Sequence, residues 1–180
     1  MQNYYGPATK FLSVRPRPGQ HDKGLLLADG RTMPCALGRS GIGIKRGEGD
    51  GITPWGRFRL LFALIRRDKI NGCNTRLLNH SISPQDGWCD APGDRNYNLP
   101  IPLPYPASHE KLWRGDDLYD IAIVMDFNFS TRMQIGGSAI FFHIARPNYS
   151  PTEGCVAISR TDMLWLLPRL DAHSVMTIGT

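Results

Sequence analysis

Short apolar runs separated by turn-forming residues dominate the hydrophobic pattern of this chain. The runs are rich in β-branched and aromatic residues and are bounded by glycine, proline or charged residues, which is typical of β-strands. An Asp-Gly pair, Asp29-Gly30, separates two of them and predicts a tight β-hairpin. The pattern therefore predicts strands at residues 9–14, 24–28, 32–37, 55–65, 120–127, 138–145 and 174–180.

One segment near the end of the chain follows a different pattern. Its apolar residues recur at spacings of three and four, which predicts an amphipathic helix that contains Met163, Leu166, Leu167 and Leu170. Ser159 and Thr161 are candidate N-caps, and Asp162 would favour the positive end of the helix dipole. Pro168 falls inside the pattern and should kink or shorten the helix.

The composition is that of one globular domain with many turns. A chain of 180 residues, of which 41% are hydrophobic, can build a core without disulfides or a structural metal. Its 19 glycines and 14 prolines are spread along the chain, and no repeat or low-complexity tract interrupts it. We therefore predict a single domain over residues 1–180, mainly β with one or two short helices.

The charge narrows the classes of partner. A net charge of +5 and a pI near 9.2 favour anionic polymers such as nucleic acid, a lipid surface or an acidic cell wall. The densest basic spots, residues 15–18 and 66–67, are not interleaved with aromatic residues, so no nucleic-acid platform is expected. No apolar stretch is long enough to span a bilayer, and no signal peptide is visible. Either the protein is intracellular or the chain is a mature or trimmed form.

The four cysteines, Cys35, Cys73, Cys89 and Cys155, lack the C-x-x-C spacing of a zinc site, so no metal is expected. Cys73 and Cys89 are close enough in sequence to form a disulfide in an oxidising compartment, a question that the sequence leaves open. Cys35 and Cys73 are expected to be buried or structural. Cys155 alone combines a preceding glycine with a histidine on a nearby apolar run, His143.

His143 and Cys155 are the candidate catalytic pair. A histidine held by a buried strand and a cysteine reached across a proline-containing loop can lie together and exchange a proton. An imidazolium there would lower the pKa of Cys155 from about 8.5 toward neutrality and populate the thiolate. Gly154 would allow a tight turn that presents amide N–H groups to a developing oxyanion. The alternative is that both side chains are simply buried in the core.

Three stretches make the chain similar to one family. Residues 140–159 resemble the active-site signature of the YkuD-type L,D-transpeptidases, which are cysteine acyltransferases of bacterial peptidoglycan. Residues 45–60 resemble that family's Gly-x-x-Thr-Pro-x-Gly-x-Phe segment through Gly51, Thr53, Pro54, Gly56 and Phe58. Residues 88–98 and 109–128 are similar to a subgroup with a Trp-x-Asp and Tyr-Asn signature and a short Thr-Glu-Gly-Cys turn.

The resemblance implies roles for the matching residues. Cys155 would be the nucleophile and His143 its general base, with backbone N–H groups around Gly154 and Cys155 as the oxyanion hole. The commoner family pattern has a histidine before the Gly-Cys pair and an arginine two residues after the cysteine. Glu153 and Ala157 stand at these positions here, so a second histidine and a basic group are missing.

Other polar residues are candidates for contact with the substrate. Arg146 would supply the missing positive charge to a substrate carboxylate, unless it is an ordinary loop arginine. Glu153 would disfavour a thiolate unless it points away or pairs with a cation, and it is a candidate to contact an acceptor amine. We expect a loop without strand or helix pattern to border the active site with Trp88, Asp90, Tyr97 and Asn98. A tryptophan in such a loop is also often its packing anchor.

The resemblance further implies a fold and a reaction. The fold would be an L,D-transpeptidase-like β-sandwich, and the thiolate would attack a bond between an L-centre and a D-residue in a peptidoglycan stem peptide. An amine of a second stem would resolve the thioester, giving a link between two diaminopimelates or, in the subgroup, between L-alanine and diaminopimelate. No metal or organic cofactor is expected. The substrate implies the periplasm or cell envelope, and carbapenems are the expected inhibitors.

Two other classes stay open. A peptidoglycan hydrolase would use the same residues with water as the acceptor. A non-catalytic cell-wall-binding module would keep the fold but has no need of a reactive thiol. A papain-like peptidase is disfavoured because its cysteine precedes its histidine by a long stretch, the reverse of the order found here.

Overall fold

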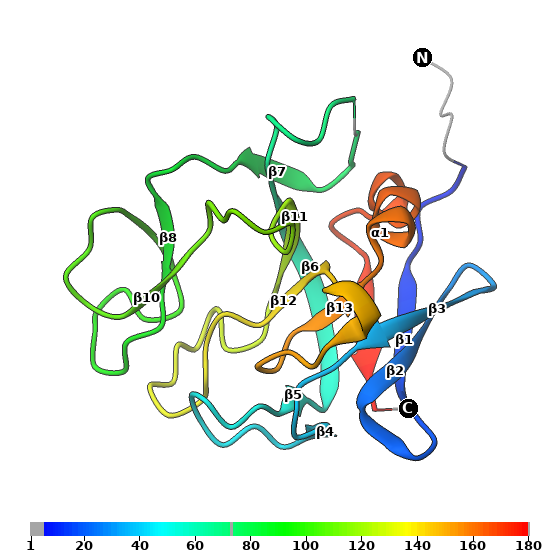
Figure 1. The fold of residues 1–180 in the computed structure, drawn as a ribbon, viewed down its shortest axis with the longest axis horizontal. Helices are drawn as coiled ribbons and strands as arrows, with labels where there is room; N and C mark the ends of the chain where they lie inside the picture. The colour runs from blue at the N-terminus through cyan, green and yellow to red at the C-terminus, as the bar shows by residue number, and fades with distance from the viewer. Residues whose placement is uncertain (1–5, 73, 180) are drawn as a thin grey trace.

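The computed structural model describes residues 6–72 and 74–179 and is built around a nine-stranded sheet (Figure 1). The strands follow the spatial order β11-β12-β13-β3-β2-β1-β14-β6-β7. Their bounds are β1 Phe11–Arg17, β2 Gln20–Ala28, β3 Arg31–Ala36, β6 Gly56–Ile65, β7 Leu78–Ser81, β11 Ile121–Met125, β12 Phe141–Ile144, β13 Val156–Ile158 and β14 Val175–Ile178. The fold is therefore mainly β, as predicted.

Each strand predicted from the apolar pattern is present in this sheet. β2 and β3 form the predicted hairpin, and Asp29 and Gly30 at its turn have φ values of 48° and 75°, as a tight hairpin requires. The proline-rich segment between the first two runs is mostly strand and not a long connection, since β1 continues to Arg17. A register shift after Pro16 accommodates it, because strand prolines are tolerated at bulges.

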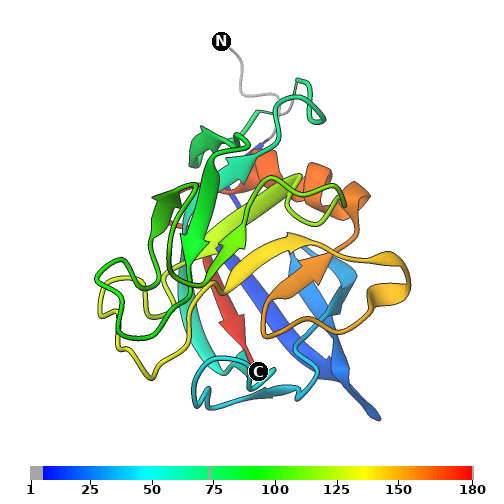
Figure 2. The ribbon, with the colours of Figure 1, turned by 60° about the vertical axis from the view of Figure 1, so that its left-hand side comes forward.

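The strand β6 closes the sheet. Residues Gly56–Arg59 pair with β14, whereas Leu60–Ile65 pair with β11. Because β11 also pairs with β12 at the far end of the strand order, the sheet curls round and encloses a core. Figure 2 shows this curvature from the blue strands of the N-terminal half across red β14 to cyan β6.

Alternate side chains of the central strands enter two different cores. The first core, inside the closed sheet, is largely aliphatic and contains Phe142 and Val156. The second core lies on the opposite face and contains Trp88, Phe141 and Cys155. Successive side chains of a strand point to opposite faces, so neighbours in the sequence are separated in this way. The strand pattern thus assigns Cys155 to the second core.

The predicted helix is present as α1 (Arg160–Leu166), followed by the 3₁₀ turn η2 (Leu167–Arg169). Ser159 is its N-cap, and its Oγ accepts a hydrogen bond from the Asp162 N–H at 3.0 Å. Pro168 lies in η2, so the α-helix ends before it, as expected. A second 3₁₀ turn, η1, spans Pro147–Tyr149. None of the described helices is long and apolar enough to cross a membrane.

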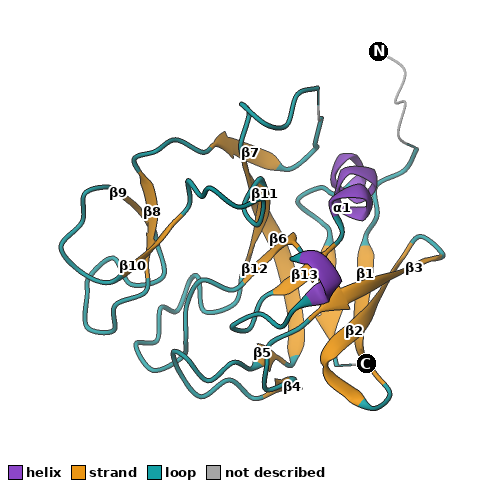
Figure 3. Ribbon diagram, viewed as in Figure 1, coloured by secondary structure: helices purple, strands orange, loops and turns teal. Residues whose placement is uncertain are grey.

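The segment that the sequence predicted as loop contains a second, small sheet. Its order is β10-β8-β9, with β8 at Asp86–Cys89, β9 at Pro100–Pro102 and β10 at His109–Lys111. Trp88 therefore lies in a strand and not in a loop. Strands this short, set among prolines and glycines, show no readable alternation. Figure 3 shows that this region, to the left of the main sheet, is mostly loop. A further pair, β4 (Ile42–Gly43) and β5 (Thr53–Pro54), lies before β6.

The cysteines outside the candidate site are buried where they are described. Cys35 lies in the first core, as predicted. Cys89 is a buried free thiol, and Cys73, its possible disulfide partner, lies outside the described residues. Neither Cys35 nor Cys89 lines the cavity that holds Cys155.

Candidate active site

The pairing of β12 with β13 places His143 and Cys155 on one face of the sheet. The two strands are parallel, with Phe142 opposite Val156 and His143 opposite Ala157. Cys155 comes directly before β13, so its side chain projects to the same side as that of His143, on a neighbouring strand. Both residues line one cavity of about 150 Å³. The structure thus brings together the two residues that the sequence singled out.

A glycine-dependent turn presents Cys155. Gly154 has a φ of 133°, and a Cβ at this position would lie 2.7 Å from the carbonyl oxygen of Ile52. The Oγ1 of Thr152 accepts a hydrogen bond from the Gly154 N–H at 3.1 Å and donates one to the Cys155 carbonyl at 2.7 Å. The turn therefore requires glycine at 154. The Gly154 N–H is engaged within the turn in the resting protein, and the Cys155 N–H is the other amide predicted for the oxyanion hole.

The sulfur of Cys155 is enclosed by backbone. It accepts a hydrogen bond from the Phe141 N–H and donates one to the Ala139 carbonyl, each at 3.3 Å. Burial raises the pKa of Cys155 to about 12, and this effect outweighs the Phe141 N–H and the charge of Lys45, which lower it. The prediction of a lowered thiol pKa is therefore wrong for the resting protein.

His143 has the form of a neutral base. Its Nδ1 lies 2.9 Å from the carbonyl oxygen of Ile144. Because a carbonyl only accepts, Nδ1 carries the proton and the lone pair is on Nε2. Burial lowers the pKa of His143 to about 4, so the imidazole is uncharged at neutral pH. The resting pair is thus a thiol and a neutral imidazole, and no imidazolium is present to activate the sulfur in advance.

Trp88 and Asn98 support the segment beside Cys155. Trp88 is 1% exposed and packs edge-on against Phe141, with ring centroids 5.0 Å apart. The Oδ1 of Asn98 accepts hydrogen bonds from Trp88 Nε1 and from the Ala139 N–H, both at 3.0 Å. Ala139 has a φ of 51°, which is uncommon for alanine, and its carbonyl oxygen accepts a hydrogen bond from the thiol of Cys155. This placement favours the packing alternative for Trp88 over direct contact with substrate.

The remaining two residues of the Trp-x-Asp and Tyr-Asn signature differ in exposure. Tyr97 is fully buried, and its hydroxyl donates a hydrogen bond to Glu48, which lines the cavity. Asp90 lines the cavity itself, and its Oδ1 is buried without a hydrogen-bond partner among the described residues. Of these two residues, Asp90 has the side-chain oxygen without a hydrogen-bond partner among the described residues.

Comparison with known families identifies the family to which this domain belongs. Residues 21–178 match the family described as the L,D-transpeptidase catalytic domain, YkuD. The chain belongs to this family. Membership confirms the resemblance noted in the sequence.

A solved structure of L,D-transpeptidase 1 from Mycobacterium tuberculosis is similar to the chain at 15% sequence identity and a TM-score of 0.39. The similarity covers 94% of this chain and 62% of that chain. None of the curated proteins compared with the chain matches it.

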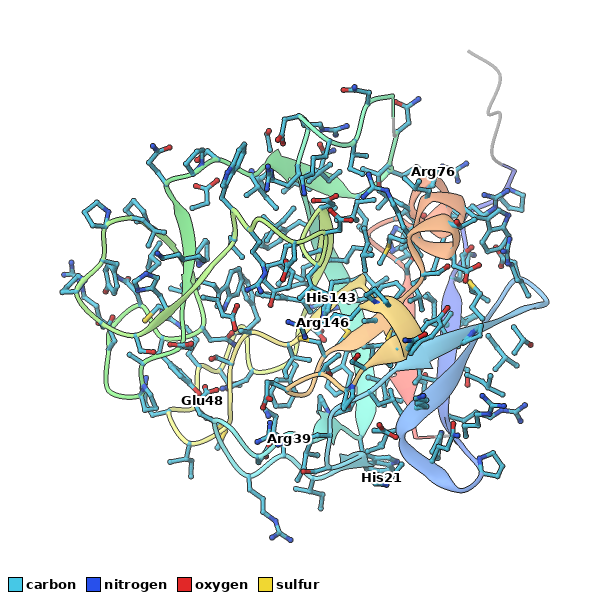
Figure 4. The ribbon with its side chains drawn as sticks, viewed as in Figure 1. His21, Arg39, Glu48, Arg76, His143 and Arg146 are labelled. Carbon is cyan, nitrogen blue, oxygen red and sulfur yellow. The ribbon has the colours of Figure 1, made fainter. Side chains whose placement is uncertain are left out.

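Most charged side chains around the cavity of this L,D-transpeptidase domain are paired. Glu153 is largely exposed and forms an ion pair with Arg39. Pairing with a cation is one of the two conditions under which its charge was expected not to disfavour a thiolate. Arg114 is held by Asp116, with Nε 2.7 Å from Oδ1. Arg146 is exposed at the rim of the cavity (Figure 4) and has no ion-pair partner among the described residues.

Sequence reasoning missed several residues of the L,D-transpeptidase cavity, among them Lys45, Glu110 and Tyr119. Lys45 has a side chain that is 3% exposed and an Nζ 2.6 Å from Asp50 Oδ1. A lysine and an aspartate that bracket a glycine-rich turn were the signal for it. Tyr119 packs edge-on against His143 and donates a hydrogen bond to Glu110 at 3.3 Å. No pattern in the sequence marks these last two residues.

Proposed function

We propose that this chain cross-links peptidoglycan by L,D-transpeptidation through a thioester on Cys155. The observation that carries the proposal is the placement of Cys155 and His143 in one cavity, with a protonated Nδ1 on the histidine. The thiol has a proton to give, and Nε2 has a lone pair to receive it. Family membership supplies the class of reaction, and this pair supplies its nucleophile and base.

In the first half-reaction, Nε2 of His143 takes the thiol proton while the sulfur attacks the carbonyl carbon of an L,D bond in a donor stem peptide. Because Thr152 occupies the Gly154 N–H, the Cys155 N–H is the amide of the turn that we assign to the oxyanion. The imidazolium then gives its proton to the leaving amine as the C–N bond breaks. A thioester remains on Cys155.

In the second half-reaction, an amine of a neighbouring stem attacks the thioester carbon. His143 accepts the surplus proton of that amine and returns it to the sulfur as the C–S bond breaks. Water in place of the amine would give hydrolysis. The low exposure of Cys155, 7%, supports transfer to an amine because it limits the access of water to the thioester.

Arg146 is the residue that we propose for a carboxylate of the donor stem. It lines both the catalytic cavity and a neighbouring hollow of about 540 Å³. A guanidinium binds a carboxylate through two parallel hydrogen bonds, and this one has no competing ion pair among the described residues. A stem peptide would then extend from Cys155 past Arg146 into the hollow.

We favour the bond between the first L-alanine and D-glutamate as the one that is cleaved. Ala157 is fully buried opposite His143, so the wall of the site has no cation two residues after the nucleophile. Arg146 offers its charge from a different direction, and a donor that follows it binds in a shifted register. The product would be a link from L-alanine to a diaminopimelate amine.

The same proposal gives a location and an inhibitor class. Peptidoglycan lies in the cell envelope, so we place the active protein there, in the periplasm of a cell that has one. Carbapenems carry a strained acyl group that a cysteine can open, and we expect them to acylate Cys155.

The test is incubation of the protein with purified disaccharide-tetrapeptide, followed by mass analysis of the products. We expect cross-linked dimers and a free peptide that begins with D-glutamate. Free D-alanine with diaminopimelate-to-diaminopimelate dimers would keep the transferase and contradict the linkage. Cleaved stems without dimers would identify a hydrolase instead.

The matched controls are two cysteine variants. Cys155→Ala should form no product, whereas Cys35→Ala, in the first core, should form it as the wild type does. A wild-type protein that leaves every stem intact and whose Cys155 does not alkylate would fit a cell-wall-binding module and would overturn the proposal.

A further inference from the structure

Lys45 is a buried cation directly beside the nucleophile. Its side chain is 3% exposed and lines the catalytic cavity together with Cys155. Its aliphatic stem passes Gly137, where a Cβ would clash with Lys45 Cε. Its Nζ lies 3.4 Å from the position that a Cβ would take on Gly154. The two glycines therefore make room for the ammonium against the turn that ends in Cys155.

Asp50 holds this ammonium from behind. Its Oδ1 accepts hydrogen bonds from Lys45 Nζ at 2.6 Å and from the Ile52 N–H at 2.9 Å, and its Oδ2 accepts one from the Arg46 N–H at 2.7 Å. Burial raises the pKa of Asp50, but the hydrogen bonds and the charge of Lys45 together outweigh burial, and the net pKa lies below its usual value. The carboxylate is therefore ionised at neutral pH. Asp50 does not line the cavity, as far as the described residues go. The pair thus turns its positive end toward Cys155.

The other cations of the cavity are less well placed. Arg114 is neutralised by two carboxylates, at 2.7 and 3.9 Å, and Arg146 lies at the exposed rim. The charge of Glu110 raises the pKa of Cys155, whereas that of Lys45 lowers it. The remaining charged or titratable side chains that line the cavity are Glu48, Asp90, Tyr119, His143 and Glu153.

The proposed reaction needs a cation at this point. The resting thiol is uncharged, so negative charge appears on the sulfur as His143 removes the proton, and then on the carbonyl oxygen of the substrate. The Gly154 N–H is already bound to Thr152, which leaves the turn with fewer amide donors for that charge. A fixed ammonium in a site that excludes water stabilises such charge strongly.

We infer that Lys45 is a catalytic residue whose ammonium stabilises the negative charge that develops on the Cys155 sulfur and on the substrate carbonyl oxygen. Lys45 stays protonated throughout, so the proton transfers of the reaction are unchanged. The inference rests on the proposed function only in taking Cys155 as the nucleophile.

The test is the alkylation of Cys155 by iodoacetamide as a function of pH, measured by mass spectrometry on the peptide that contains it. Lys45→Met keeps the apolar stem and removes the charge. We expect the apparent pKa of the thiol to rise by about one unit or more and the alkylation rate near neutral pH to fall about tenfold. An unchanged pH profile in folded Lys45→Met would overturn the inference.

Asp50→Asn distinguishes a catalytic from a structural role of Lys45 by the direction in which the alkylation rate changes. This variant removes the carboxylate that offsets Lys45 and keeps the ammonium, so alkylation should be as fast as in the wild type or faster. If the ion pair only supported the fold, both substitutions would slow alkylation, and that result would contradict a catalytic Lys45. Lys10→Met, which removes an exposed lysine outside the cavity, should leave the profile unchanged.

Lys45→Met leaves Asp50 without its partner and can fail to fold for that reason. The double variant Lys45→Gln/Asp50→Asn removes both charges and keeps a side-chain hydrogen bond. Its alkylation should also be slowed, and a wild-type profile in it would overturn the inference. Alkylation needs no peptidoglycan, so this result stands apart from the outcome of the cross-linking assay.

Discussion

The two cores of this domain, on opposite faces of β11 and β12, differ in composition and in what they do. The first core is largely aliphatic and is enclosed by the closed sheet. The second core is built around the aromatic residues Trp88, Tyr119 and Phe141, is partly covered by the small β8–β10 sheet, and includes Cys155. One face of the same strands therefore supplies stability and the other supplies the walls of a reaction site.

A shift of one residue along a strand changes the role of a side chain in this domain. Cys155 and Phe141 belong to the second core, while their immediate neighbours Val156 and Phe142 belong to the first. Substitutions at adjacent positions should accordingly affect different properties, turnover at one position and stability at the next.

The largest expected effect follows from removing the nucleophile. Cys155→Ala should lower turnover by about four orders of magnitude or more while the protein stays folded, because no other cysteine among the described residues lines the cavity. Val156→Ala should instead cost about 2–3 kcal/mol of stability and leave the chemistry of the folded molecules intact. Product formation and urea unfolding measure the two properties. Wild-type turnover in Cys155→Ala would remove the mechanism altogether.

The next effect in size concerns the base. His143→Ala should slow acylation by about two to four orders of magnitude, the usual contribution of a general base. Phe142→Ala, one residue away and facing the first core, should cost about 3–5 kcal/mol of stability instead. Rapid-quench measurement of thioester formation checks the first and denaturant unfolding the second. A loss below about tenfold in His143→Ala would mean that another group deprotonates the thiol.

The burial of His143 should also appear in the pH dependence of stability. Its pKa is lowered from 6.5 to about 4, so between these values the unfolded chain binds more protons than the folded one. The free energy of unfolding should therefore be unaffected by protonation of His143 above about pH 6.5. It should fall as the pH drops toward about 4, by about 3 kcal/mol in total from this residue. Urea unfolding of the wild type and of His143→Gln isolates the effect. Parallel curves for the two proteins would show that His143 is not buried as a neutral base.

The smallest effect tests the support behind the site. Trp88→Phe keeps the aromatic packing and removes the hydrogen bond from Nε1 to Asn98. The free energy of unfolding should fall by about 1–3 kcal/mol as a result. Asn98 also holds the Ala139 N–H, so we expect turnover to fall by less than about tenfold through loss of alignment of the thiol. Thermal unfolding and kcat measure these. A larger fall in turnover, with an unchanged fold and a raised KM, would indicate that Trp88 contacts the substrate.

The first core and its strands could be predicted from the sequence because their signal is local. Runs such as residues 138–145 are apolar, β-branched and bounded by glycine, and Ser159 and Pro168 mark the two ends of the helix. Cys155 and His143 were found by spacing and by resemblance to the family motif. Their presence on one face follows from the parallel register of β12 and β13, which no local pattern encodes.

The second core could not be predicted for the same reason. The strands of the small β8–β10 sheet that contribute to it are three or four residues long. Its contacts join separate segments, such as Trp88 with Asn98 and Asn98 with Ala139. Burial, which decides whether the thiol and imidazole carry charge, depends on all of these contacts together. Spacing and family resemblance therefore pointed to two residues that line one cavity, but the predicted lowering of the Cys155 pKa was wrong.

The central claim, that Cys155 is the acyl-accepting nucleophile and His143 its base, is tested most directly by intact-protein mass spectrometry after incubation with a carbapenem. We expect the mass to rise by one drug equivalent, with the adduct on the peptide that contains Cys155 and with much slower formation in His143→Ala. An adduct on Cys35 or Cys89, or no adduct after long incubation of the folded protein, would contradict the account.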